Sequence, residues 1–123
     1  MIKNKKALGI FGIGIDIVEV KRFKDKKFSK NTTFYKKIFS KSEIDYCNKF
    51  KSSYEHFAGK FALKEASIKS INDKIPFSQI ETSHLNSKPI VRIMKYRKKY
   101  KFITSLSHEK DFAIAVVISE RIS

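Results

Sequence analysis

The segment from Leu8 to about Val20 constrains the fold most strongly, because apolar residues occupy every second position along it. Such alternation predicts a β-strand with one apolar face. The opposite face is nearly bare, since it carries Gly12, Gly14 and then Asp16. Glycine inside a strand often marks a place where another backbone or a ligand approaches closely. Asp16 is therefore expected to stand beside cleared space, although an aspartate that begins a turn at a strand end is an equally plain interpretation.

Two helices are predicted in the middle of the chain. Residues 34–39 form a short amphipathic stretch that leads to Ser40, and Glu43 follows three residues later with the spacing of a capping box. This spacing predicts a helix from Ser40 to about Phe50. From Ser53 to Ile71 the apolar residues recur with a period near that of an α-helix, which predicts a longer helix.

Antiparallel strands are predicted after Pro76. The first pair is Ile80–Ser83 with Pro89–Ile93, and the second pair is Phe102–Ser107 with Phe112–Ser119. One strand, then helices, then antiparallel strands is an order that favours an α+β fold over a doubly wound sheet. No repeat or Pro/Gly-rich linker divides the 123 residues, so we expect a single domain, with residues 1–8 as a basic N-terminal extension.

The composition excludes several classes of protein. With 41% hydrophobic and 13% aromatic residues, the 14.3 kDa chain has enough apolar side chains for a core, which excludes an intrinsically disordered protein. The single cysteine, Cys47, excludes an intramolecular disulfide and a cysteine-rich zinc site, and we interpret it as an inert packing residue. The apolar run after the basic start is too short and too polar to span a membrane, so we expect a cytoplasmic protein.

The chain is strongly basic. Twenty-seven Lys and Arg against twelve Asp and Glu give a formal charge of +15, and nearly all of the excess is lysine spread along the sequence. A dispersed lysine surface fits phosphate groups, an acidic protein partner, or merely a lysine-rich composition. A basic nucleic-acid-binding protein is the competing class, but no nucleic-acid motif is present and arginine, which base readout prefers, is rare.

Glu65 continues an apolar row on the longer predicted helix, because steps of four residues lead from Phe57 through Phe61 to Glu65 and then to Lys69. A buried carboxylate normally has a cation, a metal or several hydrogen bonds as partners. The alternative is an exposed Glu65–Lys69 pair. Asp16 and Glu65 come from different elements and together suggest a Mg²⁺ site, since Mg²⁺ takes one or two protein carboxylates and completes its shell with waters and substrate phosphates.

Basic residues near this pair are candidates for binding those phosphates. Lys60, Lys64 and Lys69 lie within about two and a half turns of the same predicted helix, although each could equally be a solvated surface residue. His108 follows a predicted strand at a hairpin tip, which leaves it a role in proton transfer, a phosphate contact or no role at all. The other two histidines have no comparable setting, and the three together lack metal-motif spacing.

Three segments occur in an informative order over most of the chain: residues 12–23 (GIGIDIVEVKRF), residues 57–66 (FAGKFALKEA) and residues 105–109 (SLSHE). Together they resemble the three signatures of the holo-[acyl-carrier-protein] synthases, the small phosphopantetheinyl transferases. The resemblance implies an enzyme of the phosphopantetheinyl transferase fold, an antiparallel sheet packed with a long helix. It also implies transfer of the 4'-phosphopantetheine arm of coenzyme A to a serine of apo acyl carrier protein, releasing adenosine 3',5'-bisphosphate, in fatty acid biosynthesis.

The resemblance also implies roles for individual residues. Asp16 and Glu65 match the family's Mg²⁺-binding, catalytic carboxylates, and His108 matches a histidine that binds substrate or acts as an acid or base. The serine proton could leave through a metal-associated water or a carboxylate. Basic positions expected near the coenzyme A phosphates are held by Lys60, Lys64 and Lys69. The face that receives the acidic carrier protein, which a +15 enzyme would attract, is matched by Lys21, Arg22 and Lys24.

Members of the family are homotrimers, so the resemblance further implies active sites between subunits, with His108 contributed across the interface from Asp16 and Glu65. The chain departs from the family pattern at three places. Lys60 stands where arginine is common, residues 70–76 contain no glycine where a glycine-rich loop is usual, and Ser87 replaces a glycine. The missing glycine-rich loop motivates one alternative, a family member that binds coenzyme A or carrier protein without turnover.

Overall fold

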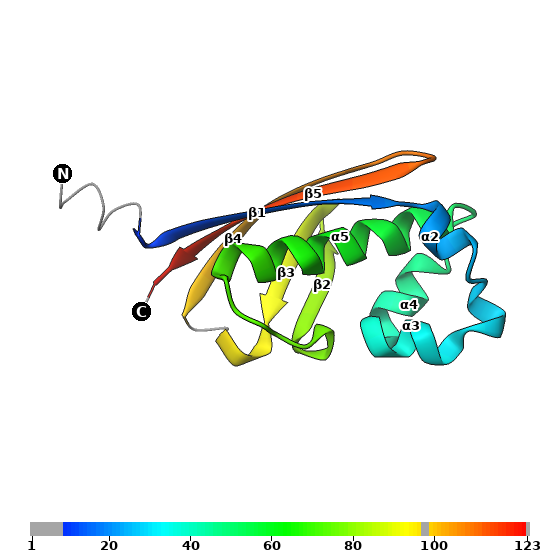
Figure 1. Ribbon diagram of the computed structural model, residues 1–123, viewed down its shortest axis with the longest axis horizontal. Helices are drawn as coiled ribbons and strands as arrows, with labels where there is room; N and C mark the ends of the chain where they lie inside the picture. Colours follow the sequence, from blue (N-terminus) through cyan, green and yellow to red (C-terminus); the bar gives the residue numbers. More distant parts are fainter. Residues whose placement is uncertain (1–8, 97–98, 123) are drawn as a thin grey trace.

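A computed structural model describes residues 9–96 and 99–122, so the predicted extension at residues 1–8 lies outside the described residues. The order of elements confirms the predicted α+β class, with strands and helices in the expected sequence (Figure 1). Besides short 3-10 turns, they are β1 (Phe11–Glu19), α2 (Lys21–Lys24), α3 (Thr32–Ile38), α4 (Lys41–Cys47), α5 (Ser53–Ile71), β2 (Ile80–Leu85), β3 (Lys88–Ile93), β4 (Tyr100–His108) and β5 (Phe112–Arg121).

The strands form two antiparallel sheets. One has the order β1-β5-β4, so the first strand of the chain pairs with the last, and the other is the β2–β3 hairpin. Helix α5 lies along one face of the three-stranded sheet, and α3 and α4 lie beside its N-terminal end (Figure 1). The pairing of β1 with β5 places Asp16 opposite Ala115, in the middle of the strand pair.

The face of β1 that carries the glycines is covered by the backbone of α5. A Cβ at Gly12 would overlap the carbonyl oxygen of Ser70, and a Cβ at Gly14 would overlap that of Ala66, so both glycines let α5 lie directly on the strand. The apolar face of β1 therefore points away from the core. Ile13, Ile15 and Ile17 are 60–68% exposed in the single chain.

The helix boundaries follow their sequence signals closely. Helix α5 spans the predicted residues, and the capping box that begins α4 is confirmed, since Ser40 Oγ accepts from the Glu43 N–H and Glu43 Oε1 accepts from the Ser40 N–H. The predicted end of α4 at about Phe50 is wrong, because the helix ends at Cys47. After Cys47 the backbone hydrogen bonds change from the i to i−4 pattern to the i to i−3 pattern of a tighter turn, and the Phe50 ring stacks on His56.

At two places where the family pattern has glycine, other residues adopt the left-handed backbone conformation. Asn72 caps the C-terminus of α5 with φ 52°, in the conformation that glycine usually supplies at this position. The β2–β3 hairpin turns through Asn86 and Ser87, both with positive φ, so Lys88 is already the first residue of β3.

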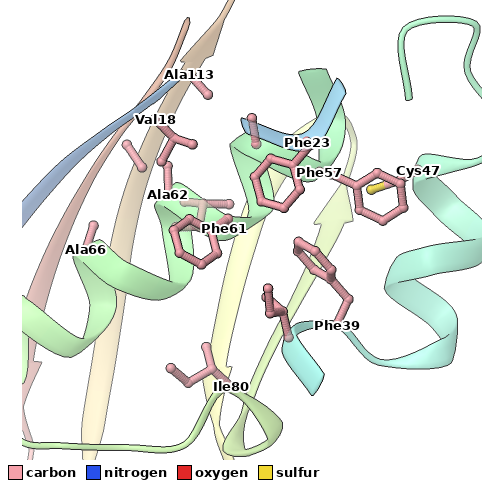
Figure 2. Close-up of a cluster of buried hydrophobic side chains, with 14 of the residues drawn as sticks. Val18, Phe23, Phe39, Cys47, Phe57, Phe61, Ala62, Ala66, Ile80 and Ala113 are labelled. Carbon is pink, nitrogen blue, oxygen red and sulfur yellow. The ribbon is translucent and has the colours of Figure 1, made fainter. Parts of the chain in front are cut away.

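The core lies between α5, the sheets and the small helices. Figure 2 shows side chains from these elements converging, with Phe23, Phe39, Phe57 and Cys47 in one cluster. Phe23 is fully buried and its ring meets five other aromatic rings. Burial raises the pKa of the Cys47 thiol to about 12, which agrees with a packing role for this residue. In the described part of the chain, no helix has both the length and the hydropathy of a membrane span.

Candidate functional site

The structure brings Asp16 of β1 and Glu65 of α5 to the same place. Both side chains are partly buried, and Lys69, one turn after Glu65, donates to Asp16 Oδ1 at 3.2 Å and to the backbone oxygen of Ile15 at 3.0 Å. Asp16 faces the helix because it shares its side of β1 with Gly12 and Gly14. The cleared space beside Asp16 thus admits the flank of α5 that carries Glu65 and Lys69.

The electrostatics of this pair differ from those of an exposed surface pair. Burial raises the pKa of Glu65, and the nearby charge of Asp16 raises it further, while Lys69 and Arg22 act in the opposite direction. The Lys69 ammonium is paired with Asp16 and Glu65 is partly buried, so the alternative of an exposed Glu65–Lys69 pair does not describe the site. Two carboxylates therefore share a partly buried position beside two cations.

This donor set fits a hard divalent cation. Besides burial, the charge of Asp16 raises the pKa of Glu65, and a cation shared by the two carboxylates would relieve this repulsion. Mg²⁺ needs only one or two protein carboxylates when phosphates and waters complete its shell. Lys69 occupies a position beside Asp16 but has a side chain that is 53% exposed, so it is free to turn toward a phosphate instead. Among the described residues, no group of three or more His, Cys, Asp or Glu side chains forms a metal cage.

Lys60 and Lys64 are placed differently from Lys69. Each is only 1% exposed. Lys64 donates to Glu43 Oε1 and to the backbone oxygen of Ile38, both at 2.7 Å, and Lys60 donates to the hydroxyl and the backbone oxygen of Thr82. These bonds occupy the Lys64 ammonium inside the protein, so the geometry does not favour it as a phosphate ligand.

Lys60 instead belongs to the wall of a second site, a cavity of about 310 Å³. We call it the histidine cavity. Its wall includes Tyr46, Phe50, His56, Lys60, His84 and His108. His108 ends β4, and its Nδ1 lies 3.5 Å from a carboxylate oxygen of Glu55. The aromatic rings are stacked, with Phe50 on His56 at 3.8 Å between centroids and Tyr46 on His84 at 4.7 Å.

The sequence pattern identified only His108 and Lys60 in this cavity. His56 and His84 carry no spacing signal, since they come from α5 and β2 and meet only in the fold. Burial lowers the pKa of both imidazoles, and the charges of Lys60 and His108 lower it further, while Glu55 acts in the opposite direction on His56. Both histidines are therefore neutral acceptors or donors at neutral pH.

The carboxylate pair and His108 lie at opposite edges of the sheet within one chain. Strand β5 separates β1 from β4, and the register aligns His108 with Ala113 and Val18, two residues beyond Asp16. Standard strand spacing puts the Cα atoms of Asp16 and His108 about 12 Å apart. Helix α5 crosses between them, since Gly59 faces Leu106 and His108 on β4, whereas its later turns lie on β1. The chain alone does not bring His108 to the carboxylates.

The predicted carrier-binding residues form the short helix α2, immediately after β1. Lys21, Arg22 and Lys24 are exposed, while Phe23 between them is buried. Lys21 pairs with Asp25 at 2.6 Å, and the Arg22 guanidinium lies over the ring of Phe61 at 4.7 Å. The charge of Arg22 also lowers the pKa of Glu65, which burial raises, so this basic surface borders the carboxylate pair.

The sequence matches a known protein family over most of its length. The family model of the 4'-phosphopantetheinyl transferase superfamily matches residues 12–117. The chain belongs to this superfamily. Within it, the holo-[acyl-carrier-protein] synthase of Clostridium kluyveri is 38% identical over 90% of both chains, and that of Ehrlichia chaffeensis is 41% identical over 89% of this chain and 95% of the relative.

Solved holo-[acyl-carrier-protein] synthases share the fold as well. The Bacillus anthracis enzyme in complex with CoA (3',5'-ADP) superposes with a TM-score of 0.76 at 30% identity, covering 90% of this chain and 96% of that one. The Helicobacter pylori enzyme in complex with coenzyme A gives 0.74 at 37% identity, covering 88% and 99%. The resemblance and the enzyme class inferred from the three motifs are thereby confirmed, as is the fold of antiparallel strands around a long helix.

Proposed function

We propose that this phosphopantetheinyl transferase transfers the 4'-phosphopantetheine arm of coenzyme A to a serine of apo acyl carrier protein in a Mg²⁺-dependent reaction. Adenosine 3',5'-bisphosphate is the second product. The observation that carries the proposal is the meeting of Asp16 and Glu65 beside Lys69 and Arg22 on the glycine-cleared face of β1. Family membership supports the reaction class, and the coenzyme A complexes of relatives support the donor.

In this mechanism the serine oxygen forms a bond to the phosphorus that carries pantetheine. The bond from that phosphorus to the bridging oxygen of the pyrophosphate breaks, and the bisphosphate leaves with the electron pair. Asp16 and Glu65 would hold Mg²⁺, which supplies charge neutralisation for the pyrophosphate and the leaving group. Lys69 has the freedom to turn from Asp16 to a phosphate oxygen, and the serine proton goes to a carboxylate or to water in the site.

The histidine cavity is proposed to hold the nucleotide end of coenzyme A. Stacked rings on its wall suit an adenine ring, and the Lys60 ammonium and the His108 imidazole offer hydrogen-bond donors to a phosphate. Its volume of about 310 Å³ suits part of a ligand of this size rather than all of it. The pyrophosphate then extends from this cavity toward the carboxylates of Asp16 and Glu65.

We propose that the protein is a homotrimer, as the family resemblance implies, and the geometry of the single chain supports a site shared between copies. The carboxylate pair and His108, which we call the two half-sites, lie at opposite edges of the sheet. A neighbouring copy brings them together if its β4 edge lies against β1. The outer sheet face is suited to association, because exposed large apolar side chains of β1, β4 and β5 lie on this same face in the strand register. They are Phe11, Ile13, Ile15, Ile17, Ile103, Phe112 and Ile114. We therefore place His108 of one subunit beside Asp16 and Glu65 of the next.

The carrier protein is proposed to dock on α2. Its three exposed basic side chains border the carboxylate pair, and acyl carrier proteins are acidic, so a chain of formal charge +15 attracts them over distances near the Debye length of about 8 Å. The cytoplasmic location and the place in fatty acid biosynthesis stay predictions from the sequence.

The test is a mass assay. The protein is incubated with coenzyme A, Mg²⁺ and apo acyl carrier protein, and the carrier is examined for the mass of the phosphopantetheine arm. Modification that disappears with a chelator and in Glu65→Ala supports the proposal. No modification by the wild type, together with calorimetric binding of coenzyme A, would instead identify a member that binds without turnover. Full activity of Glu65→Ala would contradict the metal role of this residue.

A further inference from the structure

A buried polar network joins α4, α5 and β2 behind the histidine cavity. Its members are Glu43, Lys60, Lys64 and Thr82, each at most 2% exposed. Glu43 is the central acceptor. Its Oε1 accepts from the Lys64 ammonium at 2.7 Å, and its Oε2 accepts from the backbone N–H of Thr82 at 2.8 Å and from the Thr82 hydroxyl at 2.5 Å. Every polar atom of this carboxylate is thus used inside the protein.

The direction of the hydrogen bonds is fixed by chemistry. The Lys60 ammonium can only donate, so the Thr82 hydroxyl, 3.0 Å away, must accept from it. The single proton of that hydroxyl is then directed to Glu43 Oε2. Because the Thr82 hydroxyl donates its hydrogen bond to Glu43, a lone pair of the Thr82 oxygen stays available to accept from Lys60. The backbone oxygen of Thr82 accepts a second bond from the same ammonium at 3.2 Å.

The network carries an uneven charge. It contains two ammonium groups and one carboxylate, and the carboxylate forms its ion pair with Lys64. Among the described residues, Lys60 has no carboxylate oxygen within ion-pair distance. Two of its three donors are held by Thr82, and its ammonium lies over the ring of Tyr46 at 4.7 Å, on the wall of the histidine cavity. Burial lowers the pKa of Lys60, as expected for an ammonium without a carboxylate partner, and this ammonium lies at the cavity.

We propose that Glu43 and Thr82 are positioning residues for the nucleotide end of coenzyme A, which hold the Lys60 ammonium at the wall of the histidine cavity and direct its remaining donor toward a bound phosphate. This inference rests on the proposed function, because it presumes that the cavity receives that end of the substrate. Glu43 acts at one remove, through Thr82, and does not touch the ligand. Its second task, neutralising Lys64, is structural.

The test separates positioning from stability by changing Thr82 first. Thr82→Val keeps the shape and the backbone N–H bond to Glu43 but removes the hydroxyl that orients Lys60, and Thr82→Ser restores it. We expect Thr82→Val to raise the KM for coenzyme A about tenfold with kcat nearly unchanged, and to weaken the binding of adenosine 3',5'-bisphosphate by a similar factor, since a hydrogen bond to a charged group is lost. Thr82→Ser should bind as the wild type does.

A double variant and a stability measurement complete the design. Lys60→Met should weaken bisphosphate binding at least as much as Thr82→Val does, and the combined variant should lose no more than Lys60→Met alone, because Thr82 acts through Lys60. Unchanged bisphosphate affinity in Thr82→Val, or losses that add, would overturn the inference even if the melting temperature fell. Wild-type protein that neither transfers the arm nor binds the bisphosphate would instead contradict the proposed function. Glu43→Gln is less suitable for this test, because it also leaves the buried Lys64 without its counter-ion.

Discussion

The Lys69 ammonium lies 3.2 Å from a carboxylate oxygen of Asp16, although the two residues are 53 positions apart in the sequence. Glu65 lies one helical turn before Lys69 and shares the same partly buried position. The protein thereby keeps two carboxylates close together with a lysine as a removable counter-ion. This arrangement predicts opposite effects of one substitution on stability and on activity.

Glu65→Gln should lower transfer activity by about 100- to 1,000-fold, because a metal ligand worth several kcal/mol of transition-state stabilisation is lost. The same variant should be at least as stable as the wild type without metal, since the raised pKa of Glu65 reports an unfavourable charge. A carboxyl with a raised folded pKa contributes stability at low pH that is lost as the pH rises through that pKa. Melting curves with and without Mg²⁺ should show metal stabilisation only in the wild type, and equal stabilisation of both would contradict the assignment.

Complementation should reveal a site shared between subunits. Asp16→Asn and His108→Ala should each be nearly inactive, but a refolded equimolar mixture should recover about a quarter of the wild-type activity, because random association pairs the two intact half-sites in that fraction of interfaces. The measurement is the mass assay on the mixture. As a control, Ile15→Glu places a charge on the outer sheet face and should give a monomer without activity. Absence of recovery in a mixture shown to have exchanged subunits would place the complete site in one chain.

The histidine cavity should make stability sensitive to mild acid. The pKa values of His56 and His84 are lowered in the folded protein, so their contribution to stability is fully present above pH 6.5 and is lost as the pH falls through the folded values. The melting temperature should therefore fall more steeply below pH 6.5 than in the variant His56→Gln/His84→Gln. Adenosine 3',5'-bisphosphate should reduce this loss, because its phosphates favour the protonated imidazoles. An identical acid dependence in the double variant would contradict this account.

Two glycine substitutions should have unequal effects. Gly14→Ala should destabilise the protein by about 3 kcal/mol or more, since the new methyl overlaps the Ala66 carbonyl oxygen and neither backbone can yield cheaply. Gly59→Ala is the matched control. Its Cβ meets the flexible end of Leu106 at 3.2 Å and the His108 ring at 3.8 Å, and the helix gains about 1 kcal/mol of intrinsic propensity. Urea unfolding should show a large loss for the first variant and a change within about 1 kcal/mol for the second.

Ser87→Gly should stabilise the β2–β3 hairpin. Ser87 has φ 66°, which costs a residue with a Cβ about 1 kcal/mol, whereas glycine adopts this conformation freely and completes an Asn-Gly turn with Asn86. The melting temperature should rise by several degrees for a domain of this size. Since Ser87 also lines the histidine cavity, the KM for coenzyme A should be measured alongside. A lower melting temperature would contradict the assignment of strain to this turn.

Local sequence signals were sufficient to predict the long helix, the start of α4 and the two carboxylates of the candidate site. The capping box at Ser40 and the helical period of residues 53–71 depend on interactions between residues a few positions apart, so the printed sequence contains them. Asp16 and Glu65 could be selected because glycine and apolar neighbours make a carboxylate unusual at both positions. The order of three motifs then indicated the family that the comparisons confirm.

Tertiary structure alone decided which faces are covered and which charges are buried. Alternation in β1 predicts two faces but not that α5 lies on the glycine face and leaves the isoleucines exposed, since that depends on the pairing of β1 with β5. The sequence does not distinguish Lys60 and Lys64 from solvated lysines. In the fold they are buried, and Thr82 and Glu43 from other elements accept their hydrogen bonds. His56, His84 and His108 meet for the same reason. Contacts between distant segments carry no local periodicity, so only the folded chain displays them.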